Sequence, residues 1–296
     1  MTLSIPLLGN NMLFSRIITA IVLVSFFVAV LFTVSSDYFN LCVAAVILMA
    51  GWEWSSLSEL TSMRARCLYQ ALLISAMVTV AFYAGIIFGS PALVNIDIFL
   101  FWFFSVSIIF WLLALLLVIT HPRLSVIMHS RYFRLLIGLL VLTSAWLGLS
   151  FLRNHSEGIF WVLYVVAVVA SADIGAYFFG KQFGKTKLAS QVSPGKSWEG
   201  LAGGLLLSQL LVLLMVGINA QVHFMALPNV QTLLLVTFLI ATVSALGDLF
   251  ESILKRIAGI KDSGTILPGH GGVLDRIDGL TSAVPIFSFV FLLLAW

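Results

Sequence analysis

The stretch IFLFWFFSVSIIFWLLALLLVI, residues 98–119, is 22 residues long and has no charged side chain. Because a helix rises about 1.5 Å per residue, this stretch can cross the roughly 30 Å of hydrocarbon in a bilayer. Similar apolar runs lie at 14–34, 39–56, 68–89, 134–152, 159–179, 201–219, 229–250 and 280–296. We therefore predict an all-α, polytopic integral membrane protein with about nine transmembrane helices.

The composition points to the same class. Hydrophobic residues make up 61% of the 296 residues, whereas soluble domains are about 45–50% apolar. A soluble fold of this size cannot bury so much apolar surface, and the sequence lacks the alternating pattern typical of membrane barrel strands. The first run is too long for the core of a signal peptide, and no small-residue cleavage site follows it. We interpret it as a retained span.

The positions of the basic residues predict the orientation. If the N-terminus is cytoplasmic, 14 of the 15 Lys and Arg residues lie on the cytoplasmic side and only Arg153 lies outside. Cytoplasmic loops of membrane proteins are enriched in these residues. We predict a cytoplasmic N-terminus and a C-terminus on the outer side. The chain would form one membrane domain, 1–296, in which residues 1–158 supply N-terminal helices and 159–296 carry the chemistry.

Two aspartates lie near the predicted cytoplasmic ends of spans. Asp173 is in the sixth apolar run and Asp248 is in the eighth. An acid within a span is costly and often functional, although a lone one can also be a helix end that contacts headgroup water. Two at matching depth, each leading into a basic loop, favour a functional interpretation.

The eighth run continues into further polar residues. If it remains helical, Ser252, Lys255 and Arg256 follow Asp248 on the same helix face. A carboxylate, a hydroxyl and two cations on one face suit a phosphate-bearing ligand with a metal. The alternative is an ordinary surface ion pair between Glu251 and Lys255, which would not require the Ser or the Asp.

The segment LPGHGGVLDRIDG, residues 267–279, interrupts two apolar runs. Asp275 and Asp278 share one helical face there, with Arg276 between them. Carboxylates at this spacing can anchor Mg²⁺, with substrate phosphates completing the coordination. The alternative is helix capping, since acids favour helix N-termini. His270 could orient a phosphate or stabilise the turn.

The loop at 180–200 contains GKQFGKT, which is one residue short of a phosphate-binding P-loop and follows a membrane span, so we reject that interpretation. In SPGKSWEG, Ser193 could cap a helix with Pro194 in its first turn. A functional interpretation has Lys196 and Ser197 reaching toward phosphate. Glu53 and Glu59, at the end of the second run, are expected to be solvated or to snorkel.

Residues 252–278, SILKRIAGIKDSGTILPGHGGVLDRID, resemble the signature of phosphatidate cytidylyltransferases, the CDP-diacylglycerol synthases. Every fixed position of that pattern is matched. The segments ADIGAYFFGKQFGKTKL (172–188) and SPGKSWEG (193–200) also resemble a second block of this family. The similarity covers roughly residues 160–296 closely, while the first half is similar only in its hydrophobic spans.

The resemblance implies a Mg²⁺-dependent reaction of CTP with phosphatidic acid that gives CDP-diacylglycerol and pyrophosphate in phospholipid biosynthesis. It also implies a protein of the bacterial inner membrane with its active site facing the cytoplasm. It implies catalytic roles for Asp248, Lys255, Asp275 and Asp278, of which the three aspartates would bind the metal. The implied substrate-binding residues are Asp173, Lys196, Ser197, Ser252, Arg256, Lys261, His270 and Arg276.

The resemblance also leaves some questions open. Asp262 is in the signature and could serve a metal or pair with Lys261. The resemblance does not decide whether a second, monovalent cation takes part or whether the protein forms a homodimer, and no nucleic-acid partner is expected. The rival classes are a transporter and a transferase that consumes CDP-lipids. The first would need charges near the midplane and repeated halves, and the second a different aspartate spacing; the sequence has neither.

Overall fold

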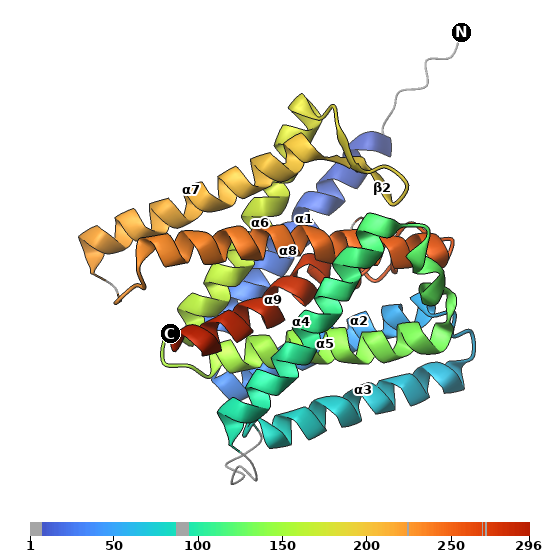
Figure 1. Ribbon diagram of the computed structural model, residues 1–296, viewed down its shortest axis with the longest axis horizontal. Coiled ribbons are helices and arrows are strands. Elements are labelled where there is room, and N and C mark those ends of the chain that lie inside the picture. The colour runs from blue at the N-terminus through green and yellow to red at the C-terminus, as the bar shows by residue number, and fades with distance from the viewer. Residues whose placement is uncertain (1–7, 87–94, 224, 268, 270) are drawn as a thin grey trace.

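The structure is a computed structural model that describes residues 8–86, 95–223, 225–267, 269 and 271–296, with side chains from residue 18 onward. Nine α-helices occur in these ranges (Figure 1): α1 Leu8–Thr33, α2 Ser36–Leu57, α3 Met63–Tyr83, α4 Ile96–Thr120, α5 Arg131–Arg153, α6 Gly158–Phe183, α7 Trp198–Val222, α8 Val230–Ile257 and α9 Leu274–Leu294. The remaining elements are a 3₁₀ helix, η1 (Leu124–His129), and an antiparallel hairpin of β1 (Lys187–Ala189) and β2 (Ser193–Ser197). The predicted all-α fold is confirmed.

The helices match the predicted spans one to one. Within the described residues, α2 to α9 are each long and apolar enough to cross a membrane, and the part of α1 with described side chains, Ile18–Thr33, is a shorter apolar helix. The chain is an integral membrane protein. The differences are at the ends: α1 and α9 each begin six residues before their predicted runs, and α8 continues seven residues beyond its own, through the charged turn.

The connections that carry most basic residues lie at one end of the bundle. Trp54 in α2 donates from Nε1 to the carbonyl of Arg134 in α5, 2.9 Å away. Arg256 in α8 donates from Nε to the carbonyl of Val192 in the hairpin, at 3.3 Å. In Figure 1 the α2–α3 and α4–α5 connections lie at the right, whereas the C-terminus and the α5–α6 connection lie at the left. We call the end with the α2–α3 and α4–α5 connections the basic end, and the end with the C-terminus and the α5–α6 connection the opposite end.

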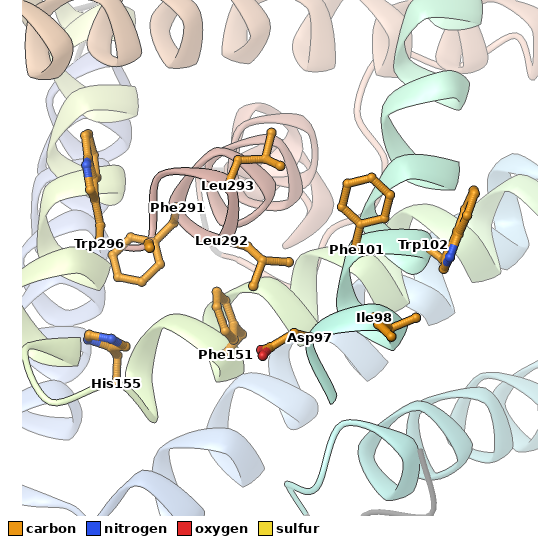
Figure 2. Close-up of a pocket in the computed structure, with 11 residues that line it drawn as sticks. Asp97, Ile98, Phe101, Trp102, Phe151, His155, Phe291, Leu292, Leu293 and Trp296 are labelled. Carbon is orange, nitrogen blue, oxygen red and sulfur yellow. The ribbon is translucent and has the colours of Figure 1, made fainter. Parts of the chain in front are cut away.

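A cavity of about 720 Å³ lies at the opposite end, between the ends of α4, α5 and α9. Figure 2 shows its lining, which is mainly aromatic and aliphatic and includes Phe101, Phe151, Phe291 and Trp296. Asp97 and His155 are its titratable residues, and it contains none of the predicted site residues. The predicted chemistry therefore lies elsewhere.

Helices α6 and α7 pack against each other through glycines. A Cβ atom added at Gly175 would lie 2.5 Å from the carbonyl oxygen of Gly203, and one at Gly204 would lie 2.5 Å from that of Ala172. Small residues allow such close approach between membrane helices. This contact places Asp173, in α6, beside the first turns of α7.

Candidate active site

A second cavity, of about 460 Å³, lies between α6, α7, α8, α9 and the hairpin. Part of its wall is apolar, from residues such as Tyr177, Leu201 and Leu205. Its polar wall brings together eight of the predicted site residues: Asp173, Lys196, Ser197, Asp248, Lys255, Asp275, Arg276 and Asp278. Asp262 also lines it. Residues up to 105 positions apart in sequence thus meet in one cavity.

The α8 face forms as predicted, because the helix remains regular to Ile257. Ser252 is buried and its hydroxyl donates to Asp248 Oδ1 at 3.4 Å. Lys255 lies 2.7 Å from Glu251 Oε2, so the expected i, i+4 pair is present, but the same ammonium also reaches Asp275 Oδ1 at 2.7 Å. The pair is therefore one part of a network that joins α8 to α9.

Three carboxylates face the cavity from three helices. Asp173 comes from α6, Asp248 from α8 and Asp278 from α9, and the negative charges of these groups repel one another. Lys196 Nζ, from the hairpin, forms a 2.5 Å ion pair with Asp248 Oδ2. Lys196 and Arg276 both act electrostatically on Asp173. The three acids, partly balanced by these cations, form the candidate site for a cation.

Asp275 differs from these three because its carboxylate accepts backbone hydrogen bonds from the α8–α9 connection. Oδ1 accepts a hydrogen bond from Lys255 Nζ, and Oδ2 accepts from the backbone N–H groups of Ser263 and Gly272 at 3.0 and 2.8 Å. The carboxylate thereby fastens the α8–α9 connection to the first turn of α9. Its metal-binding role stays a prediction.

Three of the remaining predicted residues lie outside the cavity lining. Arg256 is exposed and contacts the Val192 carbonyl, and Lys261 is exposed in the α8–α9 connection. Ser252 reaches the site only through Asp248. His270 lies outside the described residues.

The prediction that Ser193 caps a helix is wrong. Residues Ser193–Ser197 form strand β2, and Ser197 caps α7 by accepting a hydrogen bond from the N–H of Gly200 at 3.1 Å. The reason is the pairing of Ala189 with Ser193 and of Lys187 with Ser197, which keeps this segment extended, so that α7 begins only at Trp198. Glu199, in the first turn of α7, accepts hydrogen bonds from the N–H groups of Lys185 and Thr186, directly before β1. Two backbone donors of GKQFGKT are thus directed to a protein carboxylate.

The expectation that Glu53 is solvated is also wrong. This residue is 2% exposed, and its carboxylate accepts three hydrogen bonds from the α8–α9 connection and the start of α9. Glu59 is exposed, but it forms an ion pair with the buried Arg134 at 3.2 Å. An acid at the end of an apolar run fits either outcome, so the local sequence could not distinguish them.

The fold and the cavity define an all-α membrane protein whose charged cavity lies at the basic end of the bundle. Comparison with known proteins identifies its family. A profile of the cytidylyltransferase family matches residues 14–294. The phosphatidate cytidylyltransferase of Pseudomonas aeruginosa is 41% identical over 285 residues, covering 96% of this chain and 99% of that protein.

Two further relatives carry the same name. The phosphatidate cytidylyltransferase of Haemophilus influenzae is 36% identical, covering 95% of this chain and 99% of its own length. That of Bacillus subtilis is 37% identical over 60% of this chain and 66% of its own length. The chain belongs to the phosphatidate cytidylyltransferase family and is an enzyme of the nucleotidyltransferase class.

Proposed function

We propose that this protein transfers CMP from CTP to phosphatidic acid, and so produces CDP-diacylglycerol and pyrophosphate for phospholipid biosynthesis. The observation that carries the proposal is the 460 Å³ cavity, where Asp173, Asp248 and Asp278 face Lys196, Lys255 and Arg276 beside an apolar wall. A lipid phosphate and a nucleoside triphosphate both carry negative phosphates that cationic side chains can bind, and the lipid also needs apolar contacts. The names of the relatives agree with this substrate pair.

In the proposed reaction, a phosphate oxygen of phosphatidic acid attacks the α-phosphorus of CTP. A new phosphorus–oxygen bond forms, and the bond to the β-phosphate oxygen breaks, so that pyrophosphate leaves with the electron pair. Because the attacking oxygen already carries negative charge, little proton abstraction is needed. The protein would contribute mainly orientation and charge stabilisation.

The cationic side chains would hold the phosphates. Lys196 reaches the cavity from the hairpin and Arg276 from the first turn of α9, so the two could bind phosphate groups from different sides. Lys255 lies between Glu251 and Asp275 and would keep their charges balanced beside the site. We assign Ser252 to orienting Asp248, because its hydroxyl contacts that carboxylate.

The carboxylates fit a Mg²⁺ ion for which the protein supplies only part of the ligands. Among the described side chains, no group of three or more His, Cys, Asp or Glu residues is arranged around a single point as metal ligands. Mg²⁺, however, is usually held by one or two carboxylates together with water and substrate phosphates. Asp173, Asp248 and Asp278 line the same cavity and repel one another, which suits such an incomplete set. When bound, Mg²⁺ would polarise the α-phosphate and stabilise the leaving pyrophosphate.

The test uses the full-length protein purified in detergent, with CTP labelled at the α-phosphate. With phosphatidic acid and Mg²⁺ we expect a labelled lipid-soluble product and an equal amount of pyrophosphate. Omitting phosphatidic acid, replacing it with diacylglycerol or adding excess EDTA should each abolish the product. A protein that yields no labelled lipid with phosphatidic acid, or yields as much with diacylglycerol, would contradict the proposal.

A further inference from the structure

The N-terminal half of the chain contributes one buried acid to the end of the bundle where the cavity lies. Glu53 is in the last turn of α2 and is 2% exposed. Its Oε1 accepts the backbone N–H of Val273 at 3.0 Å, and its Oε2 accepts the N–H of Leu274 at 2.8 Å and the hydroxyl of Ser263 at 3.0 Å. Within the described residues, no Lys or Arg forms an ion pair with it.

These contacts cap α9 from another helix. The first N–H groups of an α-helix have no partner within the helix and need one elsewhere. The N-cap residue of α9, Val273, has no side chain that could supply it. Glu53 accepts two of these N–H groups, and a carboxylate at a helix N-terminus is also favoured by the helix dipole.

The glycines of the connection fit around this carboxylate. A Cβ atom at Gly264 or Gly272 would overlap Glu53, and one at Gly272 would also overlap Ser263. The chain of the connection therefore passes directly over the carboxylate on two sides. A contact with so little free space defines the position of the connection closely.

The same connection also contacts the site residue Asp275, in the first turn of α9. The hydroxyl of Ser263 donates to Glu53, while its backbone N–H donates to Asp275. Leu274, whose N–H donates to Glu53, directly precedes Asp275 in α9. Glu53 and Asp275 thus hold the two ends of the connection in place, and Asp275 in turn contacts Lys255.

We propose that Glu53 is a positioning residue for the nucleotidyl transfer. It fixes the first turn of α9, and through that turn it sets the places of Asp275, Arg276 and Asp278 in the cavity. This inference rests on the proposed function for its kinetic part, but its structural part stands independently. The Glu53→Gln variant should disturb the arrangement, because its amide group has only one acceptor oxygen and places an NH₂ against N–H donors.

The first measurement is steady-state kinetics of Glu53→Gln and of a matched control, Glu157→Gln, which changes an exposed glutamate at the opposite end. Rates are expressed per folded molecule, from the monodisperse fraction in size-exclusion chromatography. We expect kcat of Glu53→Gln to fall at least tenfold and half-saturation by Mg²⁺ to rise, while Glu157→Gln stays at the wild-type values. A variant that only lost folded protein would keep the wild-type kcat and Mg²⁺ half-saturation per folded molecule, and that result would overturn the proposal.

Ser263→Ala provides a milder variant, since it removes one hydrogen bond to Glu53 and keeps the backbone bond to Asp275. We expect a change in the same direction and about severalfold in size, consistent with the loss of one hydrogen bond to a charged group. Wild-type kinetics in this variant would also count against the proposal.

The second measurement does not depend on activity. Lys261 is exposed within the connection, so trypsin cleavage after it reports how firmly the connection is held. Cleavage in Glu53→Gln should be at least tenfold faster than in Glu157→Gln, and equal rates would overturn the inference. If the wild-type protein makes no labelled lipid, the proposed function fails, whereas this cleavage test still decides the role of Glu53.

Discussion

The ammonium of Lys255 lies 2.7 Å from Asp275 Oδ1 and so joins α8 to the first turn of α9. Both side chains are largely buried, at 12% and 8% exposure. The same aspartate accepts backbone hydrogen bonds from Ser263 and Gly272. Asp275 therefore stabilises the fold of the site, whether or not it also binds a metal.

We predict that Asp275→Asn abolishes turnover and also destabilises the protein. The change removes the Lys255–Asp275 ion pair, leaving Lys255 with Glu251 alone, and it weakens the hydrogen bonds from Ser263 and Gly272. We expect a cost of about 1.5–3 kcal/mol, which is typical of a lost hydrogen bond to a charged group. The variant should insert in the membrane but unfold at a clearly lower temperature in detergent. Thermal unfolding followed by intrinsic fluorescence, beside the lipid-labelling assay, measures both effects. Wild-type rates with excess Mg²⁺ would contradict the assignment.

Asp278→Asn should behave differently. Asp278 lies within α9 and is repelled by Asp173, Asp248 and Glu251. Neutralising it relieves that repulsion, so we expect thermal stability in the absence of divalent cations to be unchanged or higher. Turnover should nevertheless be lost, because a candidate Mg²⁺ ligand is missing.

Comparing Asp275→Asn with Asp278→Asn separates a role in stabilising the fold from a role in binding Mg²⁺. A stabilising shift on addition of Mg²⁺ is expected for the wild-type protein and should be reduced in Asp278→Asn. If Asp278→Asn retains both the shift and the activity, Asp278 is not a metal ligand.

The fold was largely predictable because lipid imposes one strong constraint. A run such as 98–119 without a charge can only be a spanning helix, and it appears as α4, Ile96–Thr120. The shared polar face of Asp248, Ser252 and Lys255 required the eighth run to remain helical beyond residue 250, and α8 does so, to Ile257. Helix ends were less predictable, because pairing with other segments decides them, as where β2 pairs with β1 and α7 begins only at Trp198.

Eight of the predicted site residues line one cavity, but their different contacts were not predictable. Asp275 and Asp278 look equivalent in the sequence, three residues apart, yet Asp275 accepts from Lys255, Ser263 and Gly272, whereas Asp278 accepts from the adjacent N–H of Gly279. Glu53 could not be assigned at all, because its partner Ser263 is 210 residues away in the sequence. Contacts of this kind depend on how distant helices pack, and a single sequence contains no local signal for them.

The orientation prediction can be tested with single cysteines in a variant that carries Cys42→Ser and Cys67→Ser. Ser190→Cys lies in the hairpin at the basic end, and Ser156→Cys lies in the α5–α6 connection at the opposite end. A membrane-impermeant maleimide applied to intact spheroplasts should label Ser156→Cys and not Ser190→Cys, because basic loops face the cytoplasm. Disruption of the membrane should make both accessible. Labelling of Ser190→Cys before disruption would reverse the proposed orientation.

The close contact of α6 and α7 predicts a steric effect at Gly204. A Cβ atom there would lie 2.5 Å from the carbonyl oxygen of Ala172, whereas nothing lies within 4 Å of one at Gly217 in the same helix. Gly204→Ala should therefore push the helices apart, cost about 1–3 kcal/mol of stability and lower turnover, since Ala172 adjoins Asp173. Gly217→Ala should be neutral or more stable by up to about 1 kcal/mol, because alanine favours the helix. Thermal unfolding and CTP turnover of both variants measure the difference, and equal stability would show that α6 and α7 tolerate a wider separation than this contact implies.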